Sequence, residues 1–181
     1  MTLFLQTFGI LLQVKSLYLL RHAKAEFGLS DGSDFERMLT PTGKQDAVRL
    51  GYRMMGRGMS PQHFVGSPSL RTRQTLQRLL EPFNQGDDQV EWVDELYHAD
   101  ESTWMRIISS APNHLHSCLY CGHNPALTQI ANRLSADVQW DHMPTCGLLV
   151  LAFDVSNWDE LKGSKGRLVW FDSPKSDTTI L

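Results

Sequence analysis

The stretch Leu17-Tyr18-Leu19-Leu20-Arg21-His22 is an apolar run that ends abruptly in two basic residues. A short apolar run bounded by polar residues is typical of a buried β-strand. The two basic side chains would then lie just beyond the carboxyl end of that strand. In open α/β sheets, ligands bind at this position. The stretch therefore predicts both an element of a central sheet and a candidate binding position at its edge.

Similar apolar runs alternate with amphipathic stretches along the rest of the chain. The expected strands are Leu17–Leu20, His63–Val65, Val90–Val93, Cys118–Cys121, Leu148–Phe153 and Leu168–Phe171. The expected helices are Pro41–Arg57, Pro68–Leu80, Ser102–Ser109 and Pro125–Leu134. This alternation predicts a three-layer α/β fold, in which helices flank a mostly parallel central sheet. No convincing helix separates the last two strands, so one of them is expected to pair antiparallel at an edge.

Three of the expected helix starts have the same construction. A good N-cap residue stands directly before proline in Thr40-Pro41, Ser67-Pro68 and Asn124-Pro125. Capping alone would explain all three pairs. Two of them also follow a strand at once, and a helix N-terminus at such a junction can bind an anion.

Length and charge indicate one ordinary domain. The chain has 181 residues and a net charge of −3, and it contains no basic block. We therefore expect a single domain over residues 16–181 and no nucleic-acid partner. Residues 1–15 are expected to be an N-terminal extension, to which the sequence assigns no role. Its apolar part, Thr2–Val14, is too short to span a bilayer and lacks the features of a secretory signal, so no membrane association is expected.

The cysteines predict neither a disulfide framework nor a metal site. Cys118 and Cys121 have the spacing of a zinc or redox half-site, but they lie in an expected strand. Residues three apart on a strand point to opposite faces, so the two thiols cannot hold one metal ion. We interpret these residues and Cys146 as buried free thiols, which favours a reducing, cytoplasmic compartment.

The ends of three expected strands carry the candidate functional residues. Arg21 and His22 follow the first strand, Arg71 lies in the first turn after the second, and His123 follows the strand Cys118–Cys121. If these strands are neighbours, two imidazoles and two guanidinium groups surround one crevice. Phosphoryl transfer needs such a set, because one imidazole can attack phosphorus while the cations and the second imidazole bind the oxygens.

The motifs that contain these residues resemble those of the histidine phosphatase superfamily, which has the phosphoglycerate mutase-like fold. The resemblance extends from about residue 16 to about residue 171. It is carried by Leu20–Lys24 (LRHAK), Leu39–Gly43 (LTPTG), Ser67–Thr75 (SPSLRTRQT) and Gly122–Pro125 (GHNP). Within the superfamily, the residues of the last motif, GHNP, and of Leu96–Ala99 (LYHA) are most similar to those of the SixA-type phosphohistidine phosphatases.

The resemblance implies a role for each matching residue. His22 would be the nucleophile that becomes transiently phosphorylated, and water would then hydrolyse the phosphoenzyme. Arg21, Arg71 and His123 would bind the phosphoryl oxygens and stabilise their charge, and the motif selects Arg71 over Arg73. No metal and no cofactor would be needed, since these groups supply the positive charge. The implied substrate is protein phosphohistidine.

One feature of the superfamily does not match. Many members have a carboxylic general acid shortly after a leucine, but here His98 stands two residues beyond Leu96, and Glu95 is out of register. The acid could therefore be Glu95, His98 or absent. A missing acid fits a phosphohistidine substrate, since its leaving nitrogen takes up a proton near neutral pH. The alternative is a small-molecule phosphomonoesterase with Glu95 as the acid.

The connections between the motifs favour a large substrate. Residues 22–40 and 81–95 contain short polar connections without an inserted lid, so the pocket is expected to be open to a phosphorylated partner protein. A catalytically weak phosphate-binding module that docks phosphoproteins is a third hypothesis. The other histidines are interpreted as loop residues without the partner spacing of a metal site; they are His63, His114, His116 and His142.

Overall fold

The computed structural model describes residues 14–27 and 34–175. Its strands are β1 (Val14–Arg21), β2 (His63–Gly66), β3 (Val90–Trp92), β4 (Ser117–Gly122), β5 (Leu148–Asp154) and β6 (Arg167–Asp172). Its α-helices are α1 (Pro41–Gly56), α2 (Leu70–Leu80), α3 (Glu101–Ser109) and α4 (Ala126–Leu134). Short 3₁₀ turns include Asp34–Glu36 and Asp94–Leu96. The alternation of strands and helices expected from the sequence is confirmed.

The described strands form a single sheet in the order β3-β2-β4-β1-β5-β6. The β1–β4, β2–β4 and β2–β3 pairs are parallel, whereas β5 is antiparallel to both of its neighbours. The antiparallel pairing expected at an edge is confirmed, since β6 is the edge strand and pairs antiparallel with β5. The other strand of this pair, β5, lies inside the sheet between β1 and β6. This placement brings the loop before β5 to the carboxyl end of β1.

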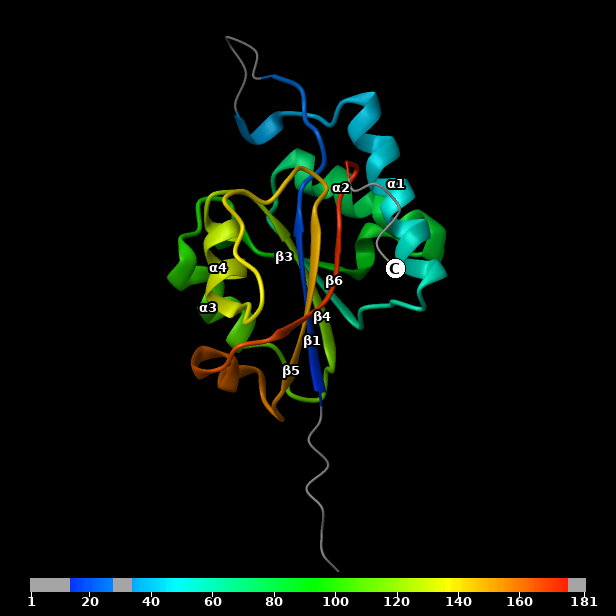
Figure 1. Ribbon diagram of the computed structural model, residues 1–181. Coiled ribbons are helices and arrows are strands. Elements are labelled where there is room, and N and C mark those ends of the chain that lie inside the picture. The colour runs from blue at the N-terminus through cyan, green and yellow to red at the C-terminus, as the bar shows by residue number, and fades with distance from the viewer. Residues whose placement is uncertain (1–13, 28–33, 176–181) are drawn as a thin grey trace, which may run out of the picture.

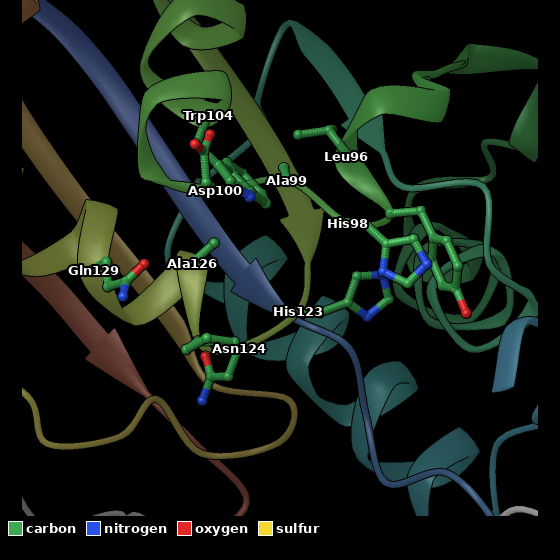
Figure 2. Close-up of a pocket in the computed structure, with 11 residues that line it drawn as sticks. Leu96, His98, Ala99, Asp100, Trp104, His123, Asn124, Ala126 and Gln129 are labelled. Atoms are coloured by element: carbon green, nitrogen blue, oxygen red, sulfur yellow. The ribbon is translucent and has the colours of Figure 1, made fainter.

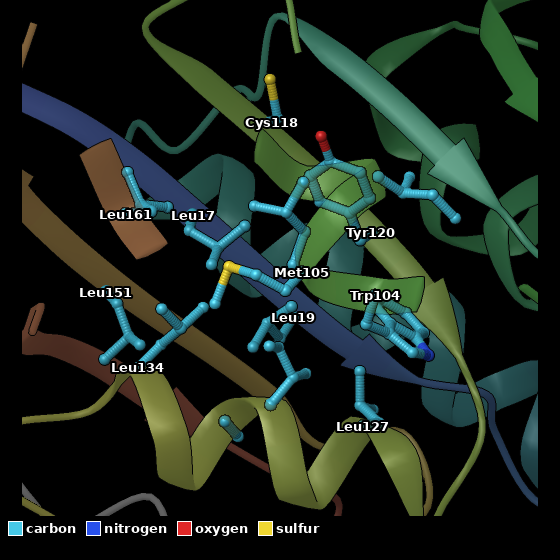
Figure 3. Packing of buried hydrophobic residues seen from close by; sticks show 14 of the residues in the cluster. Leu17, Leu19, Trp104, Met105, Cys118, Tyr120, Leu127, Leu134, Leu151 and Leu161 are labelled. Carbon is cyan, nitrogen blue, oxygen red and sulfur yellow. The ribbon is translucent and has the colours of Figure 1, made fainter. Parts of the chain in front are cut away.

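Helices cover both faces of the sheet, with α1 and α2 on one side and α3 and α4 on the other (Figure 1). The side chains of β1 alternate between these two layers. Leu17 and Leu19 pack in the core beside α3 and α4, and Figure 3 shows them near Met105 and Leu127. Tyr18 and Leu20 pack in the opposite core. The three-layer α/β architecture is therefore as predicted.

The cysteines obey the same alternation. Cys118 lies in the core on the α3–α4 side, and Cys121 lies in the core on the α1–α2 side. Both residues and Cys146 are buried free thiols, as expected. The Cys118–Cys121 pair is therefore not a half-site for a metal ion.

The first strand begins before the expected domain boundary. Val14 and Lys15 were assigned to the N-terminal extension, but both belong to β1, and Lys15 is fully buried. Its ammonium group donates to the carbonyl oxygens of Asn113 and Leu115 at 2.7 and 2.9 Å, which offsets the cost of burial. The remainder of the expected extension, residues 1–13, lies outside the described residues.

Only one of the three expected N-caps is confirmed. The Thr40 hydroxyl accepts a hydrogen bond from the Gly43 amide at the start of α1. In contrast, α2 begins at Leu70 with Ser69 as its N-cap, and α4 begins at Ala126 after Pro125. The predictions for Ser67 and Asn124 were wrong because both side chains make contacts beyond their own helices, at the strand ends described next.

Candidate active site

The carboxyl ends of β1, β2 and β4 lie side by side. Arg21 at the end of β1 pairs with Gly122 in β4, and Gly66 at the end of β2 pairs with Cys121. The residues that follow each strand therefore start from one edge of the sheet. This register places His22, Ser67 and His123 together, although they are far apart in the sequence.

A cavity of about 460 Å³ lies at this edge. It contains all the candidate site residues predicted from the sequence, together with several that were not. Its lining residues are Arg21, His22, Lys24, Ala25, Phe27, Asp34, Arg37, Arg71, His123, Asn124 and Thr145. Most of the charged groups in this lining are cationic, so the cavity favours an anionic ligand.

The imidazole of His22 is oriented by the backbone. Its Nδ1–H donates to the carbonyl oxygen of Ala23 at 2.8 Å, which leaves the lone pair of the neutral ring on Nε2. Burial, together with the charges of Arg71 and Arg21, lowers the pKa of His22 from 6.5 to about 4. The Ala23 amide in turn donates to Thr75 Oγ1 in α2, which fixes the backbone that holds the ring. At neutral pH His22 is therefore unprotonated on Nε2, with a lone pair available there.

His123 lies beside His22, with ring centroids 5.2 Å apart and ring planes inclined by 52°. Its Nε2 contacts Ser67 Oγ at 2.8 Å, so the Ser67 hydroxyl holds this ring instead of capping a helix. Burial and the nearby His22 lower the pKa of His123 to about 3. Its Nδ1 is buried and has no hydrogen-bond partner in the part of the chain that the structure describes. This nitrogen is available to a ligand.

Arg21 is held at one end of its guanidinium group. Nη1 donates to the carbonyl oxygen of Met143 at 2.7 Å and contacts His142 Nε2 at 2.6 Å. Burial lowers the pKa of Arg21. Within residues 14–27 and 34–175, its buried Nε has no partner. The edge formed by Nε and Nη2 is therefore the part of the fork that can bind oxygen atoms of a ligand.

Arg71 is also fixed by hydrogen bonds, in this case to one residue. Its Nη1 donates to the Asp34 carbonyl oxygen at 2.5 Å, and its Nη2 donates to Asp34 Oδ2 at 2.9 Å. Arg71 is only 6% exposed, so few other positions are open to its guanidinium group. Arg73 points elsewhere, with its guanidinium group 4.4 Å above the ring of Trp92. The cavity is therefore lined by Arg71 and not by Arg73.

Asp34 links three side chains at the mouth of the cavity. Besides Arg71, its carboxylate accepts hydrogen bonds from Arg37 at 2.8 Å and from the Tyr97 hydroxyl at 2.9 Å. The hydrogen bond from Arg37 is the largest cause that lowers the pKa of Asp34. Asp34 therefore stays ionised and is unsuited to donate a proton. Sequence reasoning missed this residue because it lies in a polar connection without a motif.

A second cavity, of about 340 Å³, adjoins the first and shares His123 and Asn124 with it (Figure 2). His98 lines this second cavity, and its ring contacts Tyr97 with centroids 4.0 Å apart and ring planes inclined by 53°. Glu95 lines neither cavity, and its exposed carboxylate pairs with Arg106 in α3. The residue proposed as the acid of a small-molecule phosphomonoesterase is thus turned away from the site.

His142 lies in a loop, as expected, but its contacts with residues of the cavity were not predicted from the sequence. It contacts Arg21, and its Nδ1 lies 3.0 Å from Asn124 Nδ2. Asn124, expected to be an N-cap, instead donates to the Met143 carbonyl oxygen and accepts from Thr128 Oγ1. These contacts exist because β5 is antiparallel, which places the loop before it at the functional edge.

No described group of three or more His, Cys, Asp and Glu side chains has the arrangement of a metal-binding cluster. None of the described helices is both long enough and apolar enough to cross a bilayer.

Comparisons with known proteins identify the family. The model of the histidine phosphatase superfamily (branch 1) matches residues 17–107, half of the chain. An uncharacterized chloroplastic protein of Arabidopsis thaliana is 28% identical over 167 residues, which cover 86% of this chain and 74% of that protein.

Solved structures agree with the family match. A crystal structure assigned to the phosphohistidine phosphatase SixA of Agrobacterium tumefaciens is 27% identical and has a TM-score of 0.76, with coverage of 88% of this chain and 98% of that one. A structure assigned to the phosphohistidine phosphatase SixA of Nakamurella multipartitia is 25% identical and has a TM-score of 0.75. The match covers 90% of this chain and 98% of that one. The fold is thus of the expected phosphoglycerate mutase-like type. From its motifs, its sheet and these matches, this chain belongs to the histidine phosphatase superfamily.

Proposed function

We propose that this protein is a metal-independent phosphatase that removes the phosphoryl group from phosphohistidine in a partner protein, through a phosphorylated His22. One observation carries the proposal: the unprotonated His22 lines the same cavity as Arg21, Arg71 and His123. The similarity to SixA proteins supports the substrate class. The buried free thiols are consistent with the reducing cytoplasm as its compartment.

In the first step, the lone pair on His22 Nε2 attacks phosphorus. A bond forms between Nε2 and phosphorus while the bond to the substrate nitrogen breaks, and the substrate imidazole takes up a proton from water. Positive charge develops on the His22 ring during attack. The Ala23 carbonyl oxygen, which accepts from Nδ1–H, stabilises that charge.

The negative charge of the transferring group is met by the fixed cations. Arg21 presents its free Nε–Nη2 edge, and Arg71 is held in place by Asp34. The buried Nδ1 of His123 donates a hydrogen bond to a phosphoryl oxygen when it carries the proton, with the Ser67 hydroxyl then donating to Nε2. These groups are positioned before the substrate binds, so little reorganisation is required in the transition state.

In the second step, water attacks the phosphorus atom of phosphorylated His22. A phosphorus–oxygen bond forms, the bond to Nε2 breaks, and the products are inorganic phosphate and a proton released to solvent. His22 returns to its neutral state with the proton on Nδ1. No external nucleophile other than water is needed.

The protein substrate is favoured over a small phosphomonoester by the position of Glu95. An alkoxide leaving group needs an acid close by, but Glu95 lines neither cavity and is paired with Arg106. Asp34 lines the site but has a lowered pKa. An imidazole leaving group requires no such acid at neutral pH.

A substrate panel with chelator present tests the proposal. Phosphate release is measured from a phosphohistidine peptide, a phosphoserine peptide, p-nitrophenyl phosphate and a sugar phosphate. We expect the highest kcat/KM on the phosphohistidine peptide, a loss of at least a hundredfold in Arg71→Ala, and near-wild-type rates in the matched control Arg73→Ala. A phosphohistidine rate no better than that on the phosphoserine peptide or the sugar phosphate would contradict the substrate, and a rate abolished by chelator would contradict metal independence.

A further inference from the structure

His142 lies in an exposed loop between α4 and β5, yet both of its ring nitrogens face hydrogen-bond donors. Nε2 lies 2.6 Å from Nη1 of Arg21, and Nδ1 lies 3.0 Å from Nδ2 of Asn124. A neutral imidazole has one acceptor nitrogen and one donor nitrogen, and an imidazolium has no acceptor at all. The ring can therefore accept from only one of these two neighbours.

The orientation of the Asn124 amide is fixed by its other partners. Thr128 Oγ1 accepts from the Met143 amide and donates to Asn124 Oδ1 at 2.9 Å. Asn124 Nδ2 also donates to the Met143 carbonyl oxygen at 3.0 Å. Because these bonds identify the Asn124 oxygen and nitrogen, it is Nδ2 that faces His142. Exchange of the amide atoms would place the Asn124 oxygen against the Met143 carbonyl oxygen, so that hydrogen bond would be lost.

The shorter, charge-assisted contact decides which nitrogen of His142 holds the lone pair. A proton on Nε2 would point at a guanidinium cation 2.6 Å away, whereas a proton on Nδ1 faces only a neutral amide at 3.0 Å. We propose that His142 is a positioning residue for the phosphoryl-binding site: as the neutral Nδ1–H tautomer, it accepts from Arg21 and orients the guanidinium fork. This inference rests on the proposed role of Arg21 in binding phosphoryl oxygens.

His142 can orient the Arg21 guanidinium group because of the hydrogen bonds that Arg21 Nη1 makes. Nη1 carries two hydrogens, and the structure gives it two acceptors, the Met143 carbonyl oxygen and His142 Nε2. With both hydrogens engaged, Nη1 has none left for a ligand, and the Nε–Nη2 edge remains available. Without His142, one acceptor remains, and the guanidinium plane can rotate about it. Ligand binding must then fix the rotation of the guanidinium group, and this loss of conformational entropy weakens the affinity.

Two variants of His142 test whether Arg21 needs a hydrogen-bond acceptor at the position of His142 Nε2 or only a polar side chain at residue 142. The amide of glutamine extends about as far from Cβ as imidazole Nε2 does, whereas the amide of asparagine extends only as far as Nδ1. His142→Gln can thus accept from Arg21, and His142→Asn cannot. His114, exposed in the loop before β4, supplies the control His114→Asn.

The experiment measures the affinity for tungstate by calorimetry and the kinetics on p-nitrophenyl phosphate. We expect His142→Asn and His142→Ala to weaken tungstate binding about tenfold and to raise KM with little change in kcat, since Arg21 binds ground state and transition state alike. We expect His142→Gln to stay within about threefold of the wild type, and His114→Asn to be unchanged. Equal losses in His142→Gln and His142→Asn, or no loss in either, would overturn the inference.

A second measurement addresses the tautomer and is independent of any substrate. Nitrogen-15 NMR of the histidine rings is expected to show His142 Nε2 unprotonated and Nδ1 protonated in the free protein, and a protonated Nε2 would overturn the assignment. The two proposals fail separately. If the variants show the expected tungstate affinities but the protein hydrolyses no phosphohistidine, the substrate assignment fails while the role of His142 stands.

Discussion

The imidazole rings of His22 and His123 lie with their centroids 5.2 Å apart, and both are neutral in the free protein. Burial is the main cause, and each ring also lies near the cations Arg21 and Arg71. Next to fixed positive charges, the fold thus keeps a lone pair on His22, and it keeps His123 neutral with an N–H that can donate to an oxygen. This combination is suited to a reaction in which one ring attacks phosphorus and the other binds the charge that develops.

The lowered pKa of His22 predicts how stability depends on pH. In the unfolded chain His22 takes up a proton near pH 6.5, whereas in the folded protein it does so only near pH 4. As the pH falls between these values, the unfolded state binds more protons, so the folded state loses stability until the folded pKa is passed. The loss assigned to His22 between pH 7 and pH 5 is on the order of 1–2 kcal/mol.

Urea unfolding at pH 7 and pH 5 checks this expectation. The free energy of unfolding of the wild type should fall more steeply than that of His22→Asn, which cannot titrate at this position. The difference between the pH-dependent changes in unfolding free energy of the two proteins removes the contribution of the titrating groups that they share. Parallel behaviour of the two proteins would mean that His22 is not held neutral by the fold.

Asp34 is expected to support catalysis through Arg71. Asp34→Ala removes the acceptor of Arg71 Nη2 and of the Tyr97 hydroxyl, while Asp34→Asn keeps an acceptor oxygen without the charge. Because the Asp34 side chain is half exposed, we expect kcat/KM on p-nitrophenyl phosphate to fall about five- to tenfold in Asp34→Ala. Asp34→Asn should lose less. An Asp34→Ala enzyme with wild-type kcat/KM would show that Arg71 needs no such support.

Gly122 is expected to be required for packing at the end of β4. A Cβ atom there would lie 2.5 Å from Cζ2 of Trp104, which is 1% exposed in the core. Gly122→Ala should therefore destabilise the protein by about 1–3 kcal/mol in urea unfolding. Gly56→Ala is the matched control, since nothing lies within 4 Å of a Cβ at the end of α1. Equal stability of both variants would contradict the packing account.

Much of the fold could be predicted from the sequence because short-range patterns determine it. The apolar run Leu17–Leu20 reads as a strand since its side chains are buried on both faces, and the structure confirms this for β1. The candidate residues Arg21, His22 and His123 were found by the rule that ligands bind beyond the carboxyl ends of parallel strands. The same rule could not find His142, which precedes an antiparallel strand.

The helix starts show a second limit of sequence patterns. Ser67 and Asn124 have the residue types of N-caps, but their side chains bind His123 and Met143 instead. A local pattern cannot reveal that a polar side chain is engaged by a distant element. Asp34 was missed for the same reason, because its partners Arg71 and Tyr97 are distant in the sequence.

The most direct test of the account is to trap the phosphoenzyme. The protein is mixed with a phosphohistidine peptide, quenched in alkali within the first turnover, digested, and analysed by mass spectrometry under conditions that preserve phosphorus–nitrogen bonds. The account predicts phosphate on His22 in the wild type and no adduct in His22→Asn. An adduct on His123 or on another residue, or phosphate release by His22→Asn at the wild-type rate, would contradict it.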